Sequence, residues 1–540
     1  MPKSTQKLVV FPANRGLNTN RNIAQLRPDE LVTAKNIVFD TATLARKKRP
    51  GLKRFDQGGF TTVNNVRGIS DYWRNVSGSQ QHQMMAYVDG RVYSISNNGV
   101  ASDVTGSVTL TATDRVTFNV YDGLLIMTFE NTVPYQYTGT GNISALVSGL
   151  MADAAAGGNL SLYQTFSGSG WLAGDPTKPH RLFKSAVGDP NTWSLASGGD
   201  AFDIDVGDGD PVGITALFPP MFDTLYVAKR KAIYRVYVAS DTTFTRNPFG
   251  YGSLLFGVKP VVKGIGCISP NTVVPIQNDV IFCSERGVHS LMQTDKLGAI
   301  ESAFLSEPIH KTFIEELNYQ RLDDMWAVYS PDLNSYLLSF PRKGASNVDD
   351  LLGYNLINGQ WYRWEQYNVA GMCQYIDTDN KTRIAVARST GRIGLIDDKL
   401  FTDIGESVTV LLKTGVIFPM GTPTQTVGFK NLTVTFVPKG NYNFTVAYKV
   451  DGLNAGTATF NMNGVGGTAL GVFTLGTDEL GFRGKVKTIT QPISGYGAGI
   501  ELTFTQTPSI ATNYEEDVEI LGYAIEIEGT EDTSETIYQG

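Results

Sequence analysis

The 540-residue sequence is poor in the residue types on which many enzymes and disulfide-stabilised proteins depend. It has 3 cysteines and 4 histidines, and only 18% of its residues are charged. Cys267, Cys283 and Cys373 form no C-x-x-C pair, and an odd number of thiols cannot all pair internally. We therefore expect the chain to fold in a reducing compartment. The four histidines lack metal-ligand spacing, so we expect each to be structural.

Several functional motifs are also missing. There is no G-x-S-x-G nucleophile elbow and no G-x-x-x-x-G-K-[ST] phosphate loop, which argues against a serine hydrolase of that type and a P-loop nucleotide-binding protein. No apolar run is long enough to cross a bilayer, so we expect no membrane span. The sequence predicts a protein without catalytic residues, cofactor or metal.

One acidic segment, DIDVGDGD, is the best candidate for a cation or catalytic site. It contains Asp203, Asp205, Asp208 and Asp210. Clustered carboxylates can bind calcium, but the EF-hand order fails because Gly207 stands at the third ligand position. Paired carboxylates could also cleave a glycosidic bond. Asp-Gly steps are ordinary turn formers, and we expect turns here.

Glycine and aromatic residues are plentiful, and their arrangement predicts an all-β protein. The stretch 325–364 holds four apolar runs separated by turn residues: Trp326–Tyr329, Tyr336–Phe340, Leu351–Leu356 and Gln360–Trp364. Short aromatic-rich segments with such turns are antiparallel strands joined by hairpins. Four strands in roughly 40 residues make one blade of a β-propeller.

Similar hairpins recur at irregular spacing, and they predict a β-propeller of about seven blades over residues 61–400. Asp-Gly turns mark two of them, at Asp89-Gly90 and Asp122-Gly123. A Gly-, Ala- and Ser-rich stretch at about 138–180 is expected to be a long loop with a strand at Leu160–Phe166. A helix is expected between Ser306 and Leu317, because Ser306 can cap it and Pro308 suits its first turn.

Residues 401–540 change pattern to longer strands with a clean period-two alternation. Leu432, Val434 and Phe436 alternate with polar residues, and Ile500, Leu502 and Phe504 do the same. One apolar face per strand predicts a C-terminal β-sandwich.

The first 60 residues differ from the rest in charge. They contain 12 Lys and Arg against 4 Asp and Glu, a balance of +8, so with −7 overall the other 480 residues carry −15. We expect an extended N-terminal docking arm, residues 1–60, that is poorly ordered alone, with a short helix over Asp29–Val38. The run Arg46–Arg49 is either a solvated charge cluster or part of a docking surface. A nucleic-acid patch is disfavoured because no aromatic residues interleave with it.

The N-terminal sequence resembles the tail nozzle proteins of short-tailed bacteriophages, also called tail tubular protein B. The resemblance rests on residues 16–19 (GLNT), Asn22, Leu26, Asp29-Glu30, Ala34, Asn36-Ile37, Leu44, Arg46 and Arg49-Pro50-Gly51. Thr43 stands where a glycine often precedes the leucine. The motifs at 189–193 (DPNTW), 202–204 (FDI) and 207–212 (GDGDPV) extend the resemblance over nearly the whole chain.

That resemblance implies a structural virion protein in the phage tail, folded and assembled in the host cytoplasm. It implies a ring of identical subunits, a homohexamer, that forms the distal DNA-ejection channel and docks on a tail adaptor ring. Tail fibres or spikes are further expected partners, and viral DNA would pass without specific binding. The expected docking residues are Asn18, Arg21, Asn36, Arg46, Lys47, Lys48, Arg49 and Pro50.

A second reading is a glycan-binding or glycan-cleaving β-propeller of a phage tail. The basic N-terminal segment favours the ring subunit, since an enzyme has no need of such an arm before its first blade. A tailspike is disfavoured because no β-helix repeat is present. Fold alone does not decide between these functions.

Overall fold

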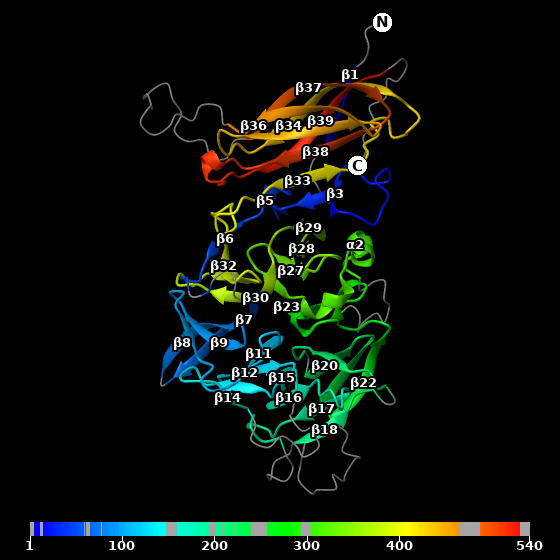
Figure 1. The fold of residues 1–540 in the computed structure, drawn as a ribbon. Coiled ribbons are helices and arrows are strands. Elements are labelled where there is room, and N and C mark those ends of the chain that lie inside the picture. Colours follow the sequence, from blue (N-terminus) through cyan, green and yellow to red (C-terminus); the bar gives the residue numbers. More distant parts are fainter. Residues whose placement is uncertain are drawn as a thin grey trace.

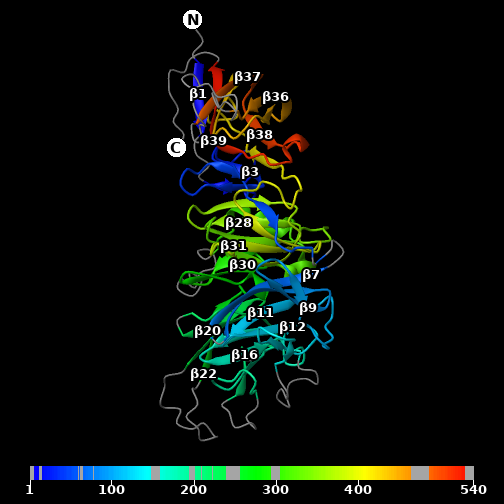
Figure 2. The same ribbon diagram turned by 90° about the vertical axis from the view of Figure 1, so that its left-hand side faces the viewer.

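The structure is a computed structural model, and it describes residues 5–10, 15–58, 60, 65–76, 78–146, 159–193, 201–207, 210–221, 223–238, 256–292, 304–463 and 486–529. The described chain is mostly β-strand, as the sequence predicts. Figure 1 shows an elongated molecule with a propeller at one end and two packed sheets at the other. The turned view in Figure 2 shows the same long axis.

The propeller is built from antiparallel sheets that follow one another along the chain. The first four sheets comprise β7 (Val66–Val76), β8 (Ser79–Val88), β9 (Arg91–Ser96) and β10 (Ala101–Asp103); β11 (Val116–Tyr121), β12 (Leu124–Phe129), β13 (Tyr135–Tyr137) and β14 (Ser144–Ala145); β15 (Leu162–Phe166), β16 (Ser169–Ala173), β17 (Arg181–Lys184) and β18 (Phe202–Asp205); β19 (Ile214–Leu217), β20 (Thr224–Lys229), β21 (Ala232–Val238) and β22 (Phe256–Lys263). The next three comprise β23 (Val274–Ile276), β24 (Asp279–Ser284) and β25 (Gly287–Ser290); β26 (Ala327–Ser330), β27 (Ser335–Phe340), β28 (Asp350–Asn355) and β29 (Gln360–Trp364); β30 (Val369–Ile376), β31 (Thr382–Arg388) and β32 (Arg392–Asp397), completed by β6 (Gly51–Arg54).

The first strand of each sheet lies nearest the propeller axis. β7 contacts β11, β11 contacts β15, and β15 contacts β19. β19 contacts the 3₁₀ turn η2 (Pro270–Thr272), β23 contacts β26, β26 contacts β30, and β30 returns to β7. The sheets therefore form a closed ring around a common axis.

The four strands expected in the stretch 325–364 are confirmed within one or two residues as β26 to β29. Asn334 adopts a positive φ of 46° and Gly359 one of 67°. These values place left-handed residues in the two turns where the sequence has Asn334-Ser335 and Asn358-Gly359, as hairpin geometry requires. Local turn chemistry thus sets the strand boundaries here.

Two further expectations in the propeller are partly confirmed. The helix is short, with α2 at His310–Glu315 preceded by the 3₁₀ turn η3 (Glu307–Ile309), and a second 3₁₀ turn η4 (Tyr319–Asp324) follows it. The strand expected at Leu160–Phe166 is β15, but the expected long loop also contains β14 and β16. Residues 147–158 of that stretch lie outside the described part of the chain.

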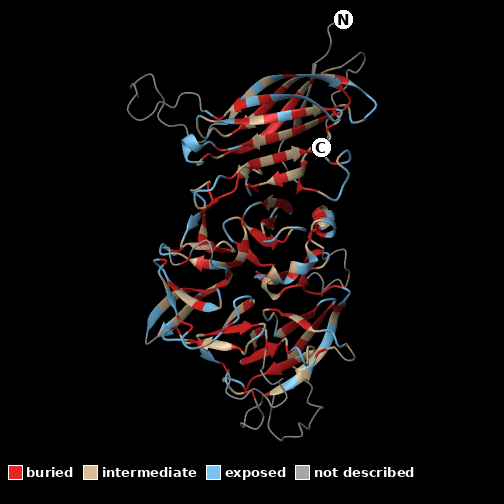
Figure 3. Cartoon of the chain, viewed as in Figure 1, coloured by how far each residue is buried: buried red, intermediate tan, exposed pale blue. Residues whose placement is uncertain are grey.

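Two packed sheets form the other end of the molecule. One has the order β37 (Lys487–Gly497), β34 (Val427–Phe436), β39 (Glu519–Gly529), β5 (Arg46–Lys48), β4 (Ile37–Phe39), with β1 (Thr5–Val10) also paired to β39. The other runs β3 (Glu30–Lys35), β33 (Val410–Thr414), β38 (Ile500–Gln506), β35 (Asn443–Val450), β36 (Leu453–Asn461). Phe436 contacts Phe444 and Phe504 contacts Tyr523 across the two sheets. The alternating apolar residues therefore meet in a shared core, which Figure 3 shows as buried bands along the strands.

The N-terminal segment is not a separate extended arm, and that expectation is corrected. β1, β4 and β5 belong to one packed sheet and β3 to the other, whereas β6 is the outer strand of the last propeller sheet. β2 (Gly16–Leu17) pairs in parallel with both β29 and β3, so one ten-stranded sheet runs from the propeller into the packed sheets. Residues 16–54 thus connect both ends of the molecule.

The expected helix over Asp29–Val38 is also wrong. This segment forms β3 and β4, separated by Asn36 at φ 56°. β3 pairs with β33 and β4 with β5, so hydrogen bonds to distant and near strands replace those of a helix. Val32, Thr33, Ile37 and Val38 are β-branched, a preference that favours strands once such partners exist.

Candidate functional site

Two residues of the N-terminal resemblance, Asn36 and Arg49, meet where the propeller joins the packed sheets. Arg49 is 1% exposed. Its Nη1 donates to Asp403 Oδ1 at 2.8 Å and to the Tyr367 hydroxyl at 3.2 Å, and its Nη2 also donates to Asp403. The guanidinium lies over the Tyr367 ring, 4.5 Å from its centroid. Burial opposes the charge, but Asp403 and Tyr367 outweigh it and hold the pKa of Arg49 above its ordinary value.

Asn36 ties the same junction together through its side-chain amide. Its Oδ1 accepts from Arg49 Nε at 3.0 Å and from the Glu365 backbone N–H at 2.9 Å, and its Nδ2 donates to the Thr409 carbonyl at 2.8 Å. Arg49, the end of β29 and the start of the packed sheets are therefore joined through one side chain. The sequence singled out Asn36 and Arg49, but it gave no signal for their distant partners Tyr367 and Asp403.

The basic run Arg46–Arg49 is not a solvated cluster. Arg46 is 3% exposed and Lys48 is 2% exposed, and both lie on strand β5. Lys48 Nζ donates to the Glu516 carbonyl at 2.7 Å, and burial, followed by the charge of Arg49, lowers the pKa of Lys48 to about 8. Lys47 points the other way, and its partly exposed ammonium pairs with Asp40 at 2.6 Å and Glu519 at 3.6 Å. Pro50 is buried as well.

Arg46 is the unusual member of the run. Its guanidinium lies 6.0 Å from the Tyr523 ring centroid, and its Nε, Nη1 and Nη2 have no hydrogen-bond partner among the described residues. Burial lowers the pKa of Arg46. A buried guanidinium whose N–H groups lack hydrogen-bond acceptors is destabilising, in contrast to that of Arg49.

The remaining expected docking residues, Asn18 and Arg21, lie beside helix α2. The Asn18 side chain is buried and donates to Glu30 Oε1 at 3.0 Å, while Arg21 is partly exposed and lies 3.8 Å from Glu30. Together with Lys311 and Glu315, Arg21 lines a surface hollow of about 480 Å³. Among the eight expected docking residues, only Arg21 and Lys47 thus expose much of their side chains.

The acidic segment does not form a cation site among the described residues. Asp203 and Asp205 both pair with Arg181, at 2.9 Å each. Asp210 pairs with Lys229 at 3.2 Å, and Asp208 lies outside the described residues. Wherever the chain is described, no three His, Cys, Asp or Glu side chains gather as a metal site would require. The described helices also include none that is both long and apolar enough to span a membrane.

The histidines occupy separate places. His82 stacks between Trp73 and Tyr375 and lies 2.5 Å from Asp71, and His289 is buried with its Nε2 2.8 Å from the Ser284 hydroxyl. His180 lies 3.5 Å from Asp205, and His310 lies 3.0 Å from the Arg286 carbonyl.

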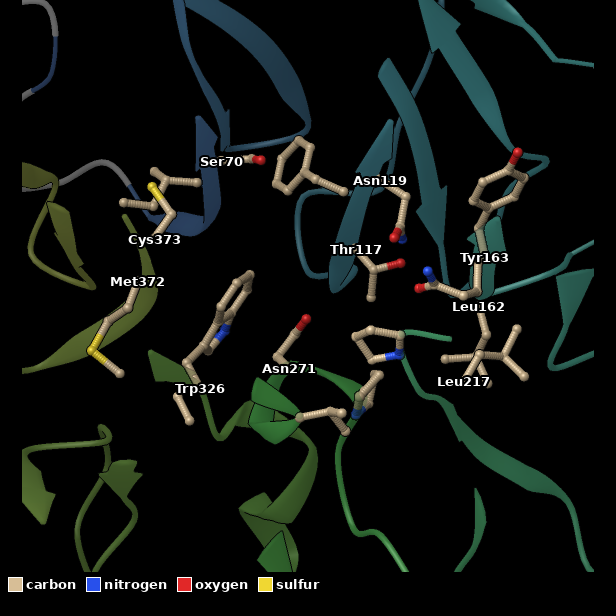
Figure 4. A pocket seen from close by; sticks show the side chains of 17 residues that line it. Ser70, Thr117, Asn119, Leu162, Tyr163, Leu217, Asn271, Trp326, Met372 and Cys373 are labelled. Atoms are coloured by element: carbon tan, nitrogen blue, oxygen red, sulfur yellow. The ribbon is translucent and has the colours of Figure 1, made fainter. Parts of the chain in front are cut away.

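A cavity of about 240 Å³ lies on the propeller axis, where the first strands of the sheets converge. Figure 4 shows Thr117, Asn119, Asn271 and Trp326 around this space. Its lining includes no Asp, Glu, His, Lys or Arg among the described residues. Sequence reasoning missed these residues, because β11, η2 and the start of β26 lie far apart along the chain and only the ring closure brings them together.

Comparisons with known proteins give no family. No family model matches the sequence, and no curated protein matches it. Three solved structures that resemble the fold are the computationally designed protein Ika8, BBS1N in complex with ARL6DN, and the extracellular domain of the putative hybrid two component system BT3049 from B. thetaiotaomicron.

These three are 11%, 10% and 9% identical to this chain, with TM-scores of 0.34, 0.37 and 0.39. The matches cover 64%, 65% and 73% of this chain, and 99%, 98% and 46% of the respective proteins. At these scores the matches carry no argument about function.

Proposed function

We propose that this protein is a structural virion protein, a ring subunit of a phage tail nozzle that forms the distal DNA-ejection channel and docks on an adaptor ring. The observation that carries the proposal is the junction built by residues 16–54. One segment contributes strands to the last propeller sheet, to the ten-stranded sheet and to both packed sheets. The buried Arg49–Asp403 pair lies at that junction.

This construction suits a subunit that must hold its shape under load. Strand β2 pairs with β29 of the propeller and with β3 of the packed sheets, and the buried Arg49–Asp403 pair lies at the same junction, so both resist movement of one end against the other. We further propose that the fold is a seven-bladed propeller with a C-terminal β-sandwich. The N-terminal segment closes the seventh blade and completes the sandwich.

The proposal changes where the adaptor ring would bind. Buried Arg46, Lys48 and Arg49 cannot reach a partner, whereas Arg21 has a side chain 44% exposed beside the hollow at helix α2. Lys311, Glu315 and Arg21 give this hollow charges of both signs. We assign the docking surface to Arg21 and the exposed end of α2, with Lys47 as a second contact.

The proposed channel would run between subunits rather than through one propeller. A cavity of about 240 Å³ cannot admit a DNA duplex, whose major groove alone is roughly 12 Å wide. A ring of identical subunits, a hexamer by resemblance, would enclose the wider passage. The virion is the corresponding location, with assembly in the host cytoplasm.

The test is imaging and mass measurement of the purified protein, alone and with the neighbouring ring protein of its tail. We expect closed rings of identical subunits that attach to the adaptor ring. Arg21→Glu should weaken attachment while the protein stays folded. Arg91→Glu is the matched control, because Arg91 is also exposed and paired with a carboxylate but lies on the first propeller sheet.

Either of two results would refute the proposal: a monomer that attaches to no other tail protein, or Arg21→Glu particles that attach as the unaltered protein does. The first would reject the ring subunit itself. The second would reject the assigned docking surface.

A further inference from the structure

The cavity on the propeller axis contains hydrogen-bonding groups that the protein itself does not use. Among the described residues, the side-chain amides of Asn119, Gln164 and Asn271 have no hydrogen-bond partner, and all three line the cavity. They come from β11, β15 and η2, which belong to different parts of the ring. None of the three is fully buried, so each can reach a molecule in the cavity.

Trp326 provides the aromatic wall of this cavity. It is 9% exposed, and Figure 4 shows its ring directed into the space between Cys373 and Asn271. Both backbone groups of Trp326 are fixed by Ser339, whose Oγ accepts at 2.7 Å and whose N–H donates at 2.8 Å. Gly68 leaves room for the ring, because a Cβ there would lie 3.2 Å from Trp326 Cζ2.

The support beneath Asn271 is also rigid. The Thr272 hydroxyl donates to the Ser269 carbonyl at 2.7 Å, and the buried Tyr336 hydroxyl donates to the Thr272 carbonyl at 2.8 Å. The amide of Asn271 is thus presented from a fixed turn. Preorganised polar groups in a partly apolar cavity are the usual features of a small-molecule site.

From this arrangement we propose that the axial cavity binds a single neutral sugar ring. Each amide is both a donor and an acceptor, which matches hydroxyl groups that are themselves donors and acceptors. The indole offers an apolar surface to the C–H face of such a ring. Because the described lining contains no Asp, Glu, His, Lys or Arg, a charged ligand would lose its hydration without compensation.

The size of the cavity limits the ligand. Its volume of about 240 Å³ lies below the roughly 300–1,000 Å³ of sites for drug-sized ligands. A longer glycan could therefore place only one residue inside. The proposal does not depend on whether the protein forms a tail ring.

The experiment titrates the full chain with D-glucose, D-galactose and N-acetyl-D-glucosamine, each to about 10 mM, because millimolar affinity is the scale of a few hydrogen bonds. Binding is followed by saturation-transfer NMR and calorimetry, with D-glucuronate as the charged comparison. We expect at least one neutral sugar to bind. Asn119→Ala and Asn271→Ala should each weaken that binding by about tenfold, the effect of losing one buried hydrogen bond.

Two further variants separate binding from folding. Gln164→Met keeps the side-chain length and removes the amide, so it should weaken binding while the circular dichroism spectrum is unchanged. Asn98→Ala, an exposed residue outside the cavity, should bind as the unaltered protein does. The proposal is overturned if none of the three sugars binds, if the cavity variants bind unchanged, or if glucuronate binds as tightly as the neutral sugars.

Discussion

Two arginines three positions apart show how differently the same side chain can be buried. Arg49 has a carboxylate, an amide, a hydroxyl and an aromatic ring as partners, whereas the guanidinium nitrogens of Arg46 have none. Removing one member of a buried ion pair leaves the other charge uncompensated. Removing a buried charge that has no ion-pair partner leaves no uncompensated charge in the interior.

We therefore expect Arg49→Met to lower the free energy of unfolding by about 3–5 kcal/mol, since it leaves Asp403 buried without its cation. Thermal and urea unfolding followed by tryptophan fluorescence measure the change. The double variant Arg49→Met/Asp403→Leu should recover much of the loss. A single variant as stable as the unaltered protein would show that the junction does not depend on this pair.

Arg46→Met should have the opposite effect. It removes a desolvated charge and keeps an apolar stem of similar length against Tyr523, so we expect stability unchanged or raised by about 1 kcal/mol. The same unfolding measurements apply. A loss as large as that of Arg49→Met would mean that Arg46 has a partner in solution.

His289 makes stability depend on pH. Burial, followed by the charges of Arg286 and His310, lowers its pKa from 6.5 to about 4. The folded state disfavours the protonated imidazole of His289. The stability that the neutral imidazole contributes is therefore complete above pH 6.5 and is lost as the pH falls from 6.5 to 4. The total corresponds to roughly 3 kcal/mol. His289→Gln should flatten this part of the pH dependence of the urea midpoint, and an unchanged slope would contradict the assignment.

At the scale of elements, strand β6 explains the glycine of the Arg49-Pro50-Gly51 sequence. A Cβ on Gly51 would lie 2.2 Å from the Thr402 carbonyl oxygen and 2.8 Å from its nitrogen. The close approach lets β6 lie between β32 and residues 400–404, where Leu52 N–H donates to the Thr402 carbonyl at 2.9 Å. Gly51 is therefore needed for contact rather than for an unusual φ.

Gly51→Ala should destabilise the protein by about 1–3 kcal/mol, because backbone atoms must move apart. Gly428→Ala is the control, since its nearest neighbour would be 3.8 Å from the added Cβ and a strand glycine gains from the replacement. Differential scanning calorimetry compares the two. Equal melting temperatures would show that the last propeller sheet tolerates the displacement.

The sequence predicted those elements whose partners are close along the chain. The turn residues of 325–364 and the alternation of Leu432, Val434 and Phe436 are sufficient to predict the strands there. Turn residues and one-sided apolar patterns specify pairing between neighbouring segments. The prediction of a helix over 29–38 is wrong because β33, the partner of β3, lies far along the chain. The axial cavity was not predictable for the same reason.

At the scale of the whole molecule, the sequence places an excess of positive charge in its first 60 residues, but part of that charge is not on the surface. Part of the +8 of residues 1–60 is buried in the junction, so those cations cannot contact a nucleic acid. The rest of the chain carries −15. The surface is thus poorly suited to hold a polyanion.

We expect no measurable binding of the isolated protein to duplex DNA at about 150 mM salt, where screening confines repulsion to roughly 8 Å. Fluorescence anisotropy with a labelled duplex, repeated at lower salt, measures this. Sub-micromolar affinity that falls steeply as salt is added would instead reveal a phosphate-binding surface.

The pairing of β1 with β39 limits how early the chain can complete this sheet during synthesis. Leu8 pairs with Ile525, so β1 has no partner until the ribosome has made β39, roughly 500 residues further along the chain. At 5–20 residues per second, adding the roughly 500 residues between them takes about 25–100 s. During that interval the sheet that will receive β1, β4 and β5 is incomplete, and the last propeller sheet waits for the chain to reach β32. The sheet that contains β1 therefore cannot be completed before β39 is made, and a chain released before that point would keep unpaired strand edges that favour aggregation.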